Sequence, residues 1–169
     1  MNTMDVLFSR KSVRSYTGEP VTEEELRLLL KAAYAAPVGR ALYDTLSLTV
    51  VTNKDFMARL NALTGREALY GAPLMILVSS KLSDGDNNVA YSNAACIVEN
   101  IALAAVELGL GTCHIWGAIR ALNGSAELLS ELPIPEGMTP CCAVIVGRTD
   151  EKYGDREIDG SRIHTAYLD

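Results

Sequence analysis

One long apolar segment near the centre of the chain constrains the fold more than any other feature. From about Asn88 to Leu108 the sequence fits a helix, and its apolar residues would cover most of the circumference of that helix. These are Ala94, Ala95, Ile97, Val98, Ile101, Ala102, Ala104, Ala105 and Leu108. A helix with so little polar surface must be buried nearly all round. Gly109 is placed to supply the left-handed residue that commonly ends a helix. We therefore expect a long, buried central helix.

The remaining composition indicates an ordinary folded domain. The chain has 169 residues, of which 49% are hydrophobic, enough to bury a core, so we expect residues 1–169 to form one domain. No apolar run approaches the roughly 20 residues that span a bilayer, and Met1–Asp5 lacks the pattern of a secretory signal. These features predict a cytoplasmic protein that does not bind membranes. The net charge of −6 disfavours nucleic acid as a partner.

The cysteines give little reason to expect a metal site. Cys141 and Cys142 are adjacent, which is a poor spacing for a two-point metal clamp. Cys96 and Cys113 lie in apolar surroundings and are typical of small buried side chains. We expect no bound metal, and a zinc or redox-dithiol role is the weaker alternative.

Several further helices are predicted by capping residues and apolar spacing. Residues 3–9 favour a short helix capped by Thr3. Thr22 and Glu25 form a capping box, which begins a helix with one buried stripe and an end before Pro37. The stripe consists of Leu26, Leu29, Leu30 and Ala33. Residues 54–64 and 118–130 also have helical patterns.

The strands are predicted by alternating or short apolar runs. These runs occupy residues 46–51, 74–78 and 141–147. Three or four strands with five helices make an α+β or α/β sheet domain. Residues 148–169 are polar and irregular. We expect this C-terminal extension to pack on another surface, and a partner subunit is one candidate.

A cluster of cations near the start of the chain is the densest chemical signal. In an extended segment from Arg10 to Tyr16, the side chains of Arg10, Ser12 and Arg14 would share one face. Two guanidinium groups and a hydroxyl suit a phosphate or another small anion. The alternative is a solvated basic turn that offsets the acidic residues that follow it.

A glycine-containing segment after the central helix has several interpretations. Gly109 and Gly111 resemble the start of a dinucleotide fingerprint, but His114 stands at the third glycine position and the segment follows a helix. We therefore reject a Rossmann site. We favour a structural role for His114, because adjacent strand residues such as Cys113 point to the opposite face. Trp116 is either a core anchor or the wall of a pocket for a planar ligand.

The order of these segments resembles the FMN-dependent nitroreductase family along most of the chain. Three stretches carry the resemblance: Arg10-Lys11-Ser12-Val13-Arg14 with the capped helix ending at Ala35-Ala36-Pro37, the central helix with its Gly109-Leu110-Gly111-Thr112-Cys113 turn, and Pro133-Ile134-Pro135-Glu136-Gly137 before the last strand. The resemblance implies an α+β fold with a central, mainly antiparallel sheet flanked by helices. It also implies a homodimer with two FMN molecules at the subunit interface.

The resemblance also implies particular cofactor-binding residues. Arg10 would bind the FMN phosphate, Arg14 would lie by N1 and the C2 carbonyl of the flavin, and Arg162 would close on the phosphate. The full set is Arg10, Lys11, Ser12, Arg14, Pro37, Val38, Gly39, Ile115, Trp116, Gly117 and Arg162. The amide-bearing run that usually follows the family's proline is replaced by residues 38–44, where Arg40 and Tyr43 are candidates to substitute for it.

The function implied is transfer of a hydride from NAD(P)H through FMN to an organic acceptor such as a nitro compound or quinone. No acid or base side chain is required of the protein, which supplies position and electrostatics. Two alternatives remain from the residues. One is a non-enzymatic flavin-binding or sensor protein of the same fold, and the other is a small-anion or nucleotide-binding module.

Overall fold

A four-stranded antiparallel sheet forms the centre of the molecule. The computed structural model describes residues 2–85, 87–154 and 156–169. The strands are β1 (Leu46–Val51), β2 (Leu74–Lys81), β3 (Gly111–Ile115) and β4 (Met138–Gly147), in the order β1-β2-β4-β3. The two central strands, β2 and β4, are buried along nearly their whole length. The three predicted strands are confirmed, and β3 is an additional strand that the sequence analysis did not assign.

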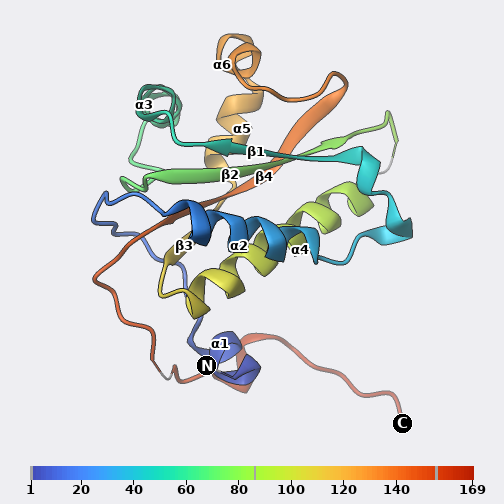
Figure 1. The fold of residues 1–169 in the computed structure, drawn as a ribbon. Helices are drawn as coiled ribbons and strands as arrows, with labels where there is room; N and C mark the ends of the chain where they lie inside the picture. Colours follow the sequence, from blue (N-terminus) through green and yellow to red (C-terminus); the bar gives the residue numbers. More distant parts are fainter. Residues whose placement is uncertain (1, 86, 155) are drawn as a thin grey trace.

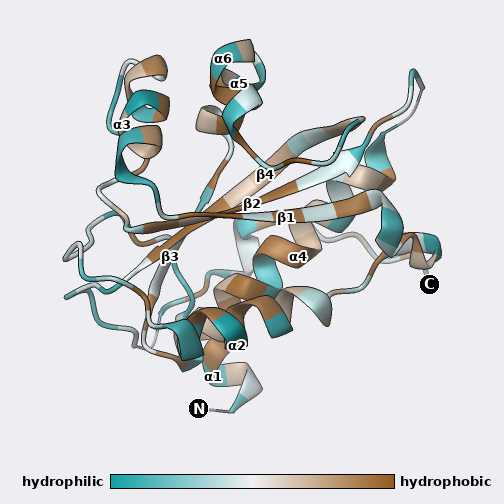
Figure 2. Cartoon of the chain, turned by 45° about the horizontal axis from the view of Figure 1, so that its top comes forward, coloured by the Kyte–Doolittle hydropathy of each residue, from teal (hydrophilic) through white to brown (hydrophobic). Residues whose placement is uncertain are grey.

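Helices cover both faces of this sheet (Figure 1). One face carries α2 (Glu23–Tyr34) and α4 (Asn88–Glu107), with α1 (Thr3–Ser9) beyond α4. The other face carries α3 (Lys54–Leu63), α5 (Gly117–Asn123) and α6 (Ala126–Glu131). Each face has its own hydrophobic cluster, and the apolar residues concentrate along the strands and the sheet-facing side of α4 (Figure 2). The α+β fold predicted from the sequence is confirmed.

The central helix is less covered than its sequence predicts. Its buried residues, such as Ala94, Ile101 and Ala105, pack towards the sheet and α2. However, Tyr91, Ser92 and Ala95 are exposed on the opposite side, so burial nearly all round is wrong for the single chain. By length and composition, α4 also has the properties of a membrane-spanning helix. The expectation that no segment approaches that length is therefore corrected, although α4 serves here as a core helix.

The helix ends follow from local hydrogen bonds. The N-cap of α1 is Asn2, whose side chain accepts from the backbone of Met4 and Asp5, so the expected Thr3 cap is wrong by one residue. Thr22 caps α2 with the predicted box, and Gly109 has the predicted left-handed φ of +70°. The helix expected at 118–130 is divided into α5 and α6, because the chain turns at residues 124–125.

The chain after β4 contains one short 3-10 turn, η3 (Gly160–Arg162), within its described residues. In Figure 1 this extension passes α1 and ends away from the sheet and its helices. Three apolar side chains near its end, Ile163, Tyr167 and Leu168, are exposed. Residues 38–45 include two further 3-10 turns, η1 (Gly39–Ala41) and η2 (Tyr43–Thr45), and Arg40 and Ala41 have positive φ angles of 58° and 54°.

Candidate functional site

Residues Arg10–Tyr16, which we call the N-terminal ribbon, lie against the start of β3. The backbone N–H of Val13 donates to the carbonyl oxygen of Thr112 at 2.8 Å, and the Val13 side chain is fully buried. Gly111 permits this approach, because a Cβ there would lie 2.8 Å from Cγ1 of Val13. The ribbon is thus fixed to the sheet by one buried residue, with Arg10, Lys11 and Ser12 half-buried beside it.

Carboxylates hold the cations of the ribbon. Arg10 Nε lies 3.2 Å from Oε1 of Glu99 on α4, and Lys11 Nζ lies 2.8 Å from Oε2 of Glu151 in the C-terminal extension. The backbone N–H of Arg14 also donates to Glu151, at 3.3 Å. The hydrogen bond from Lys11, followed by that from Arg14, holds the pKa of Glu151 below its usual value. Arg10 and Lys11 are therefore each paired with a carboxylate from a different part of the chain.

Glu99 joins the ribbon to β3 through His114. Its second oxygen, Oε2, lies 3.2 Å from Nε2 of His114, while Oε1 contacts Arg10. The hydrogen bond from His114 lowers the pKa of Glu99, burial opposes this effect, and Arg10 lowers the pKa further. The sequence analysis missed Glu99 and gave His114 a structural role. The available signal was a single carboxylate, Glu99, within the mainly apolar stretch from residue 94 to residue 106.

Trp116 follows directly after β3 and is open to solvent. Its side chain is 62% exposed, so its role as a core anchor is wrong. The indole lies beside the ring of Tyr91 on α4, with centroids 6.0 Å apart and planes tilted by 59°. Its neighbour Ile115 is buried, and Gly117 begins α5. The end of β3 therefore combines a fixed backbone with an exposed aromatic pair.

The segment Pro37–Gly39 lies on a different side of α4 from the ribbon. The N–H of Gly39 donates to Oδ1 of the buried Asn93 at 2.8 Å, whereas Arg10 contacts Glu99. Asn93 and Glu99 are six residues apart, which places their side chains about 120° apart around a helix and about 9 Å apart along it. Within one chain, Gly39 and Arg10 thus approach α4 from separate directions.

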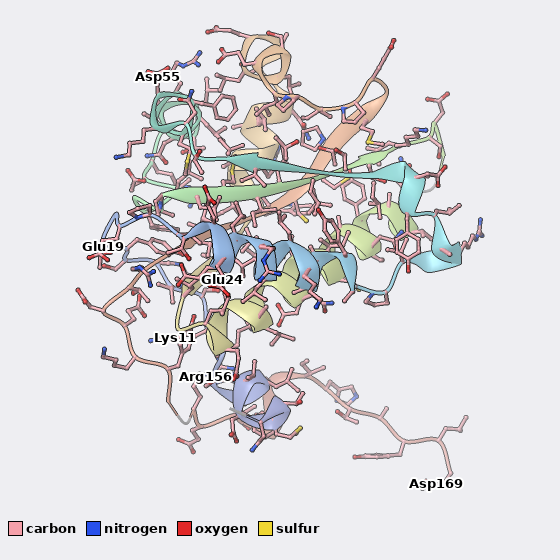
Figure 3. The ribbon with its side chains drawn as sticks, in the orientation of Figure 1. Lys11, Glu19, Glu24, Asp55, Arg156 and Asp169 are labelled. Atoms are coloured by element: carbon pink, nitrogen blue, oxygen red, sulfur yellow. The ribbon has the colours of Figure 1, made fainter. Side chains whose placement is uncertain are left out.

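Arg162 lies in η3, and its described hydrogen bond stays within the extension, from Nη2 to the carbonyl oxygen of Glu157 at 3.3 Å. The extension itself is attached to α1, because Arg156 Nε donates to the carbonyl oxygen of Phe8 at 2.7 Å. Figure 3 shows Lys11 and Arg156 near this junction, with Asp169 far from both. The structure brings the extension to the ribbon through Glu151 rather than through Arg162.

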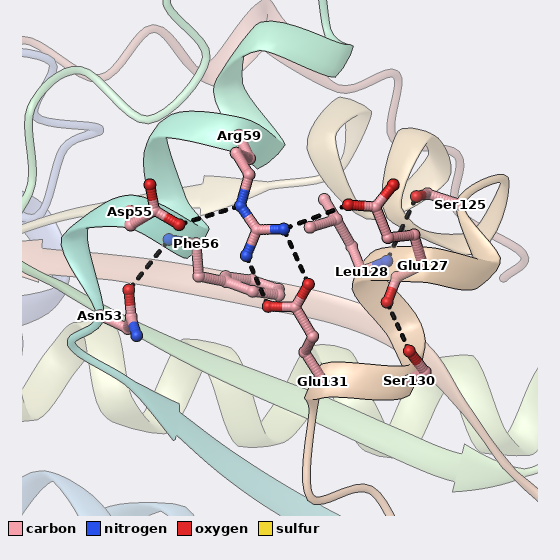
Figure 4. A network of polar contacts seen from close by, with 9 residues as sticks. All are labelled: Asn53, Asp55, Phe56, Arg59, Ser125, Glu127, Leu128, Ser130 and Glu131. Atoms are coloured by element: carbon pink, nitrogen blue, oxygen red, sulfur yellow. Dashed lines mark hydrogen bonds and ion pairs between the residues drawn. The ribbon is translucent and has the colours of Figure 1, made fainter.

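A second network of charged residues joins two helices away from the N-terminal ribbon. Arg59 on α3 contacts Asp55 on its own helix and Glu127 and Glu131 on α6 (Figure 4). These contacts join α3 to α6 on the sheet face opposite α4. Among the described residues, no group of three or more His, Cys, Asp or Glu is arranged to hold a metal ion.

Comparisons with known proteins find relatives along most of the chain. The sequence profile of the nitroreductase family matches residues 7–67 and 62–148. An Archaeoglobus fulgidus protein, provisionally named NADH dehydrogenase/NAD(P)H nitroreductase, is 28% identical over 95% of each chain. An FMN reductase (NADPH) of Bacillus subtilis is 25% identical over 92% of this chain and 69% of its own. The crystal structure of a Desulfitobacterium hafniense nitroreductase with bound FMN is 26% identical, with a TM-score of 0.84, and covers 99% of this chain and 100% of its own.

Proposed function

The chain belongs to the nitroreductase family, and from this premise we propose that it is an FMN-dependent NAD(P)H oxidoreductase that reduces an organic acceptor. The observation that carries the proposal is the N-terminal ribbon, which presents Arg10 and Lys11 beside the start of β3. Relatives along most of the chain include an NADPH-dependent FMN reductase, and a similar structure contains FMN. When bound, FMN supplies the hydride chemistry that links a reduced nicotinamide to a nitro compound, quinone or similar acceptor.

The chemistry of the ribbon residues fits the phosphate and ring of FMN. A guanidinium such as that of Arg10 matches a phosphate with two parallel hydrogen bonds, and Lys11 adds a second charge. Ser12 supplies a hydroxyl for the phosphate and ribityl chain. Arg14, exposed on the same ribbon, would stabilise negative charge at N1 and the C2 carbonyl of the flavin. These residues hold and polarise the cofactor without exchanging protons.

The other proposed contacts lie at the end of β3 and in the 37–39 segment. The backbone at Ile115, Trp116 and Gly117 would meet N5 and O4 of the flavin, and the buried side chain of Ile115 keeps this backbone in place. Pro37, Val38 and Gly39 would lie along the ring and the ribityl side of the flavin. Arg162 would approach the phosphate from the extension.

We also propose a homodimer, which would bring these parts together. Gly39 and Arg10 approach α4 from different directions in one chain, so a partner subunit would supply the 37–39 segment. The exposed face of α4 at Tyr91 and Ala95 provides a contact surface for that subunit. The exposed apolar end of the extension provides another. A single domain over residues 1–169 and a cytoplasmic location, where reduced nicotinamides are available, complete the proposal.

The test is spectroscopic and then kinetic. The purified protein is examined for flavin absorption and titrated with FMN, and NAD(P)H oxidation is measured with nitroaromatic and quinone acceptors. We expect FMN binding at micromolar protein and turnover well above that of free FMN. Failure to bind FMN would refute the proposal. Tight binding without turnover would instead favour the flavin-binding or sensor protein, an alternative motivated by the altered residues 38–44.

A further inference from the structure

We propose that Glu99 is a positioning residue that couples the binding of the phosphate-bearing cofactor to protonation of His114. This inference rests on the proposed function, because it concerns the same site. It concerns Glu99 and His114, which lie outside the expected cofactor-binding set, and it predicts how the FMN affinity depends on pH.

The carboxylate of Glu99 contacts two basic side chains, one through each oxygen. Oε1 of Glu99 is 3.2 Å from Arg10 Nε, and Oε2 is 3.2 Å from His114 Nε2. The three side chains come from the ribbon, α4 and β3, so none is a neighbour of another in sequence. Glu99 is half-buried, which makes its charge costly to leave without a partner.

A phosphate that binds Arg10 through the remaining N–H groups of the guanidinium shares that cation with Glu99. Two negative groups would then face one cation, and the carboxylate would lose much of its compensation. The remaining partner of Glu99 is His114, whose charge can change. A neutral imidazole donates from Nε2 to the carboxylate, so an additional proton enters at Nδ1. Arg10 then neutralises the phosphate, and the imidazolium of His114 neutralises Glu99.

The other described ionisable groups beside the ribbon have partners of their own. Lys11 and Glu151 form an ion pair of their own, with Arg14 beside Glu151. Tyr153, whose hydroxyl donates to the carbonyl oxygen of Leu110, has a pKa raised to about 12, chiefly by burial.

Two further ionisable side chains belong to the ribbon and to β3. Tyr16 donates to the carbonyl oxygen of Val13, and burial raises its pKa above the ordinary value. Cys113 is buried, and its Sγ contacts the carbonyl oxygen of His114 at 3.6 Å. An imidazole can accept a proton at one ring nitrogen while the other stays hydrogen-bonded to a carboxylate, so His114 is the proton acceptor in this proposal.

The experiment measures the Kd of FMN from pH 6 to pH 8.5 by quenching of flavin fluorescence, with riboflavin as the ligand that lacks a phosphate. If binding takes up one proton, the Kd of the wild-type protein rises by up to about tenfold per pH unit at the alkaline end. Glu99→Gln should remove this dependence and bind FMN about fivefold more tightly at pH 8, because a like charge near the phosphate is gone. His114→Gln should also remove the dependence but bind more weakly at pH 6.

Glu151→Gln is the matched control, because Glu151 pairs with the neighbouring ribbon cation but contacts no histidine. This variant should change the Kd while keeping the wild-type pH slope. Riboflavin should show no such slope in any variant. The titration of the FMN phosphate itself is common to all proteins and cancels in the comparison.

Equal pH slopes for the wild-type protein, Glu99→Gln and His114→Gln would overturn the inference and leave the proposed function intact. A wild-type protein that binds no FMN at any pH would refute the proposed function itself. If Glu99→Gln does not fold, as judged by circular dichroism, the comparison of the wild-type protein with His114→Gln decides the question.

Discussion

Replacing Gly111 by alanine tests whether the ribbon depends on its close contact with β3. An added Cβ would lie 2.8 Å from Val13 Cγ1 and 3.0 Å from Thr149 Cγ2, well inside the 3.5–4.0 Å of a normal carbon contact. Val13 is fully buried, and its branched side chain is stiff at χ1, so the ribbon itself must move. We expect Gly111→Ala to destabilise the protein by about 1–3 kcal/mol.

This loss corresponds to a fall in melting temperature of roughly 2–12 °C for a chain of this size. FMN affinity should fall as well, because the displaced segment carries Arg10. Thermal unfolding and FMN titration measure the two effects. Gly154→Ala is the control, because a Cβ at that position would meet nothing within 4 Å and its φ is not positive.

A double-mutant cycle with Val13→Ala identifies the contact responsible. Removing the Val13 methyl groups relieves the shortest contact, so the two substitutions together should cost less than the sum of their separate effects, by about 1 kcal/mol. Additive effects, or a Gly111→Ala protein as stable as Gly154→Ala, would refute the idea that this glycine seats the ribbon.

Three further predictions concern charged groups. Arg14→Ala should weaken FMN binding by about 1–3 kcal/mol and lower the flavin reduction potential, whereas an unchanged potential would show that Arg14 does not face the ring. Burial raises the pKa of Glu25, but hydrogen bonds from Thr22 and the charge of Arg148 outweigh it, so the folded-state pKa is lowered. The stability that ionised Glu25 contributes is therefore present above its unfolded-state pKa and is lost as the pH falls through its folded-state pKa. In urea unfolding from pH 3 to 6, Glu25→Gln should lose less free energy of unfolding on acidification than the wild-type protein. Arg59→Ala should lower the melting temperature more at low salt than at 1 M salt, because the network that it removes is exposed; equal losses would argue against an electrostatic role.

The elements that the sequence predicts are those encoded by local patterns. The capping box at Thr22 and the stripe that follows define α2 within a few residues, since both depend on neighbours in the same turn. Strand β3 lacks such a pattern, because it has five residues, begins at Gly111 and includes His114. It is a strand because β4 lies beside it and supplies hydrogen-bond partners, and no local signal reports that pairing.

For the candidate site, too, the sequence predicts the local features but not the contacts between distant residues. The charge of the ribbon is evident from Arg10 and Lys11 alone, but the identity of their partners is not. Glu99 lies 89 positions after Arg10, and Glu151 lies 140 positions after Lys11. No spacing rule connects residues so far apart in the sequence. Only the folded chain shows that carboxylates from α4 and from the extension contact the same ribbon.

The difference between the predicted and the observed burial of α4 is an argument for the proposed homodimer. The apolar pattern predicts burial for Ala95, yet this residue is exposed in the single chain. An apolar pattern reflects the surfaces that are covered in the functional assembly, whereas one chain shows only the surfaces that it covers itself. The face of α4 that is expected to be buried but is exposed in the single chain is therefore a surface on which a second subunit would pack. A bulky charge at Ala95, as in Ala95→Glu, should leave the core beneath α4 unchanged but convert the protein to monomers in sedimentation analysis, and a variant that remained fully dimeric would place the interface elsewhere.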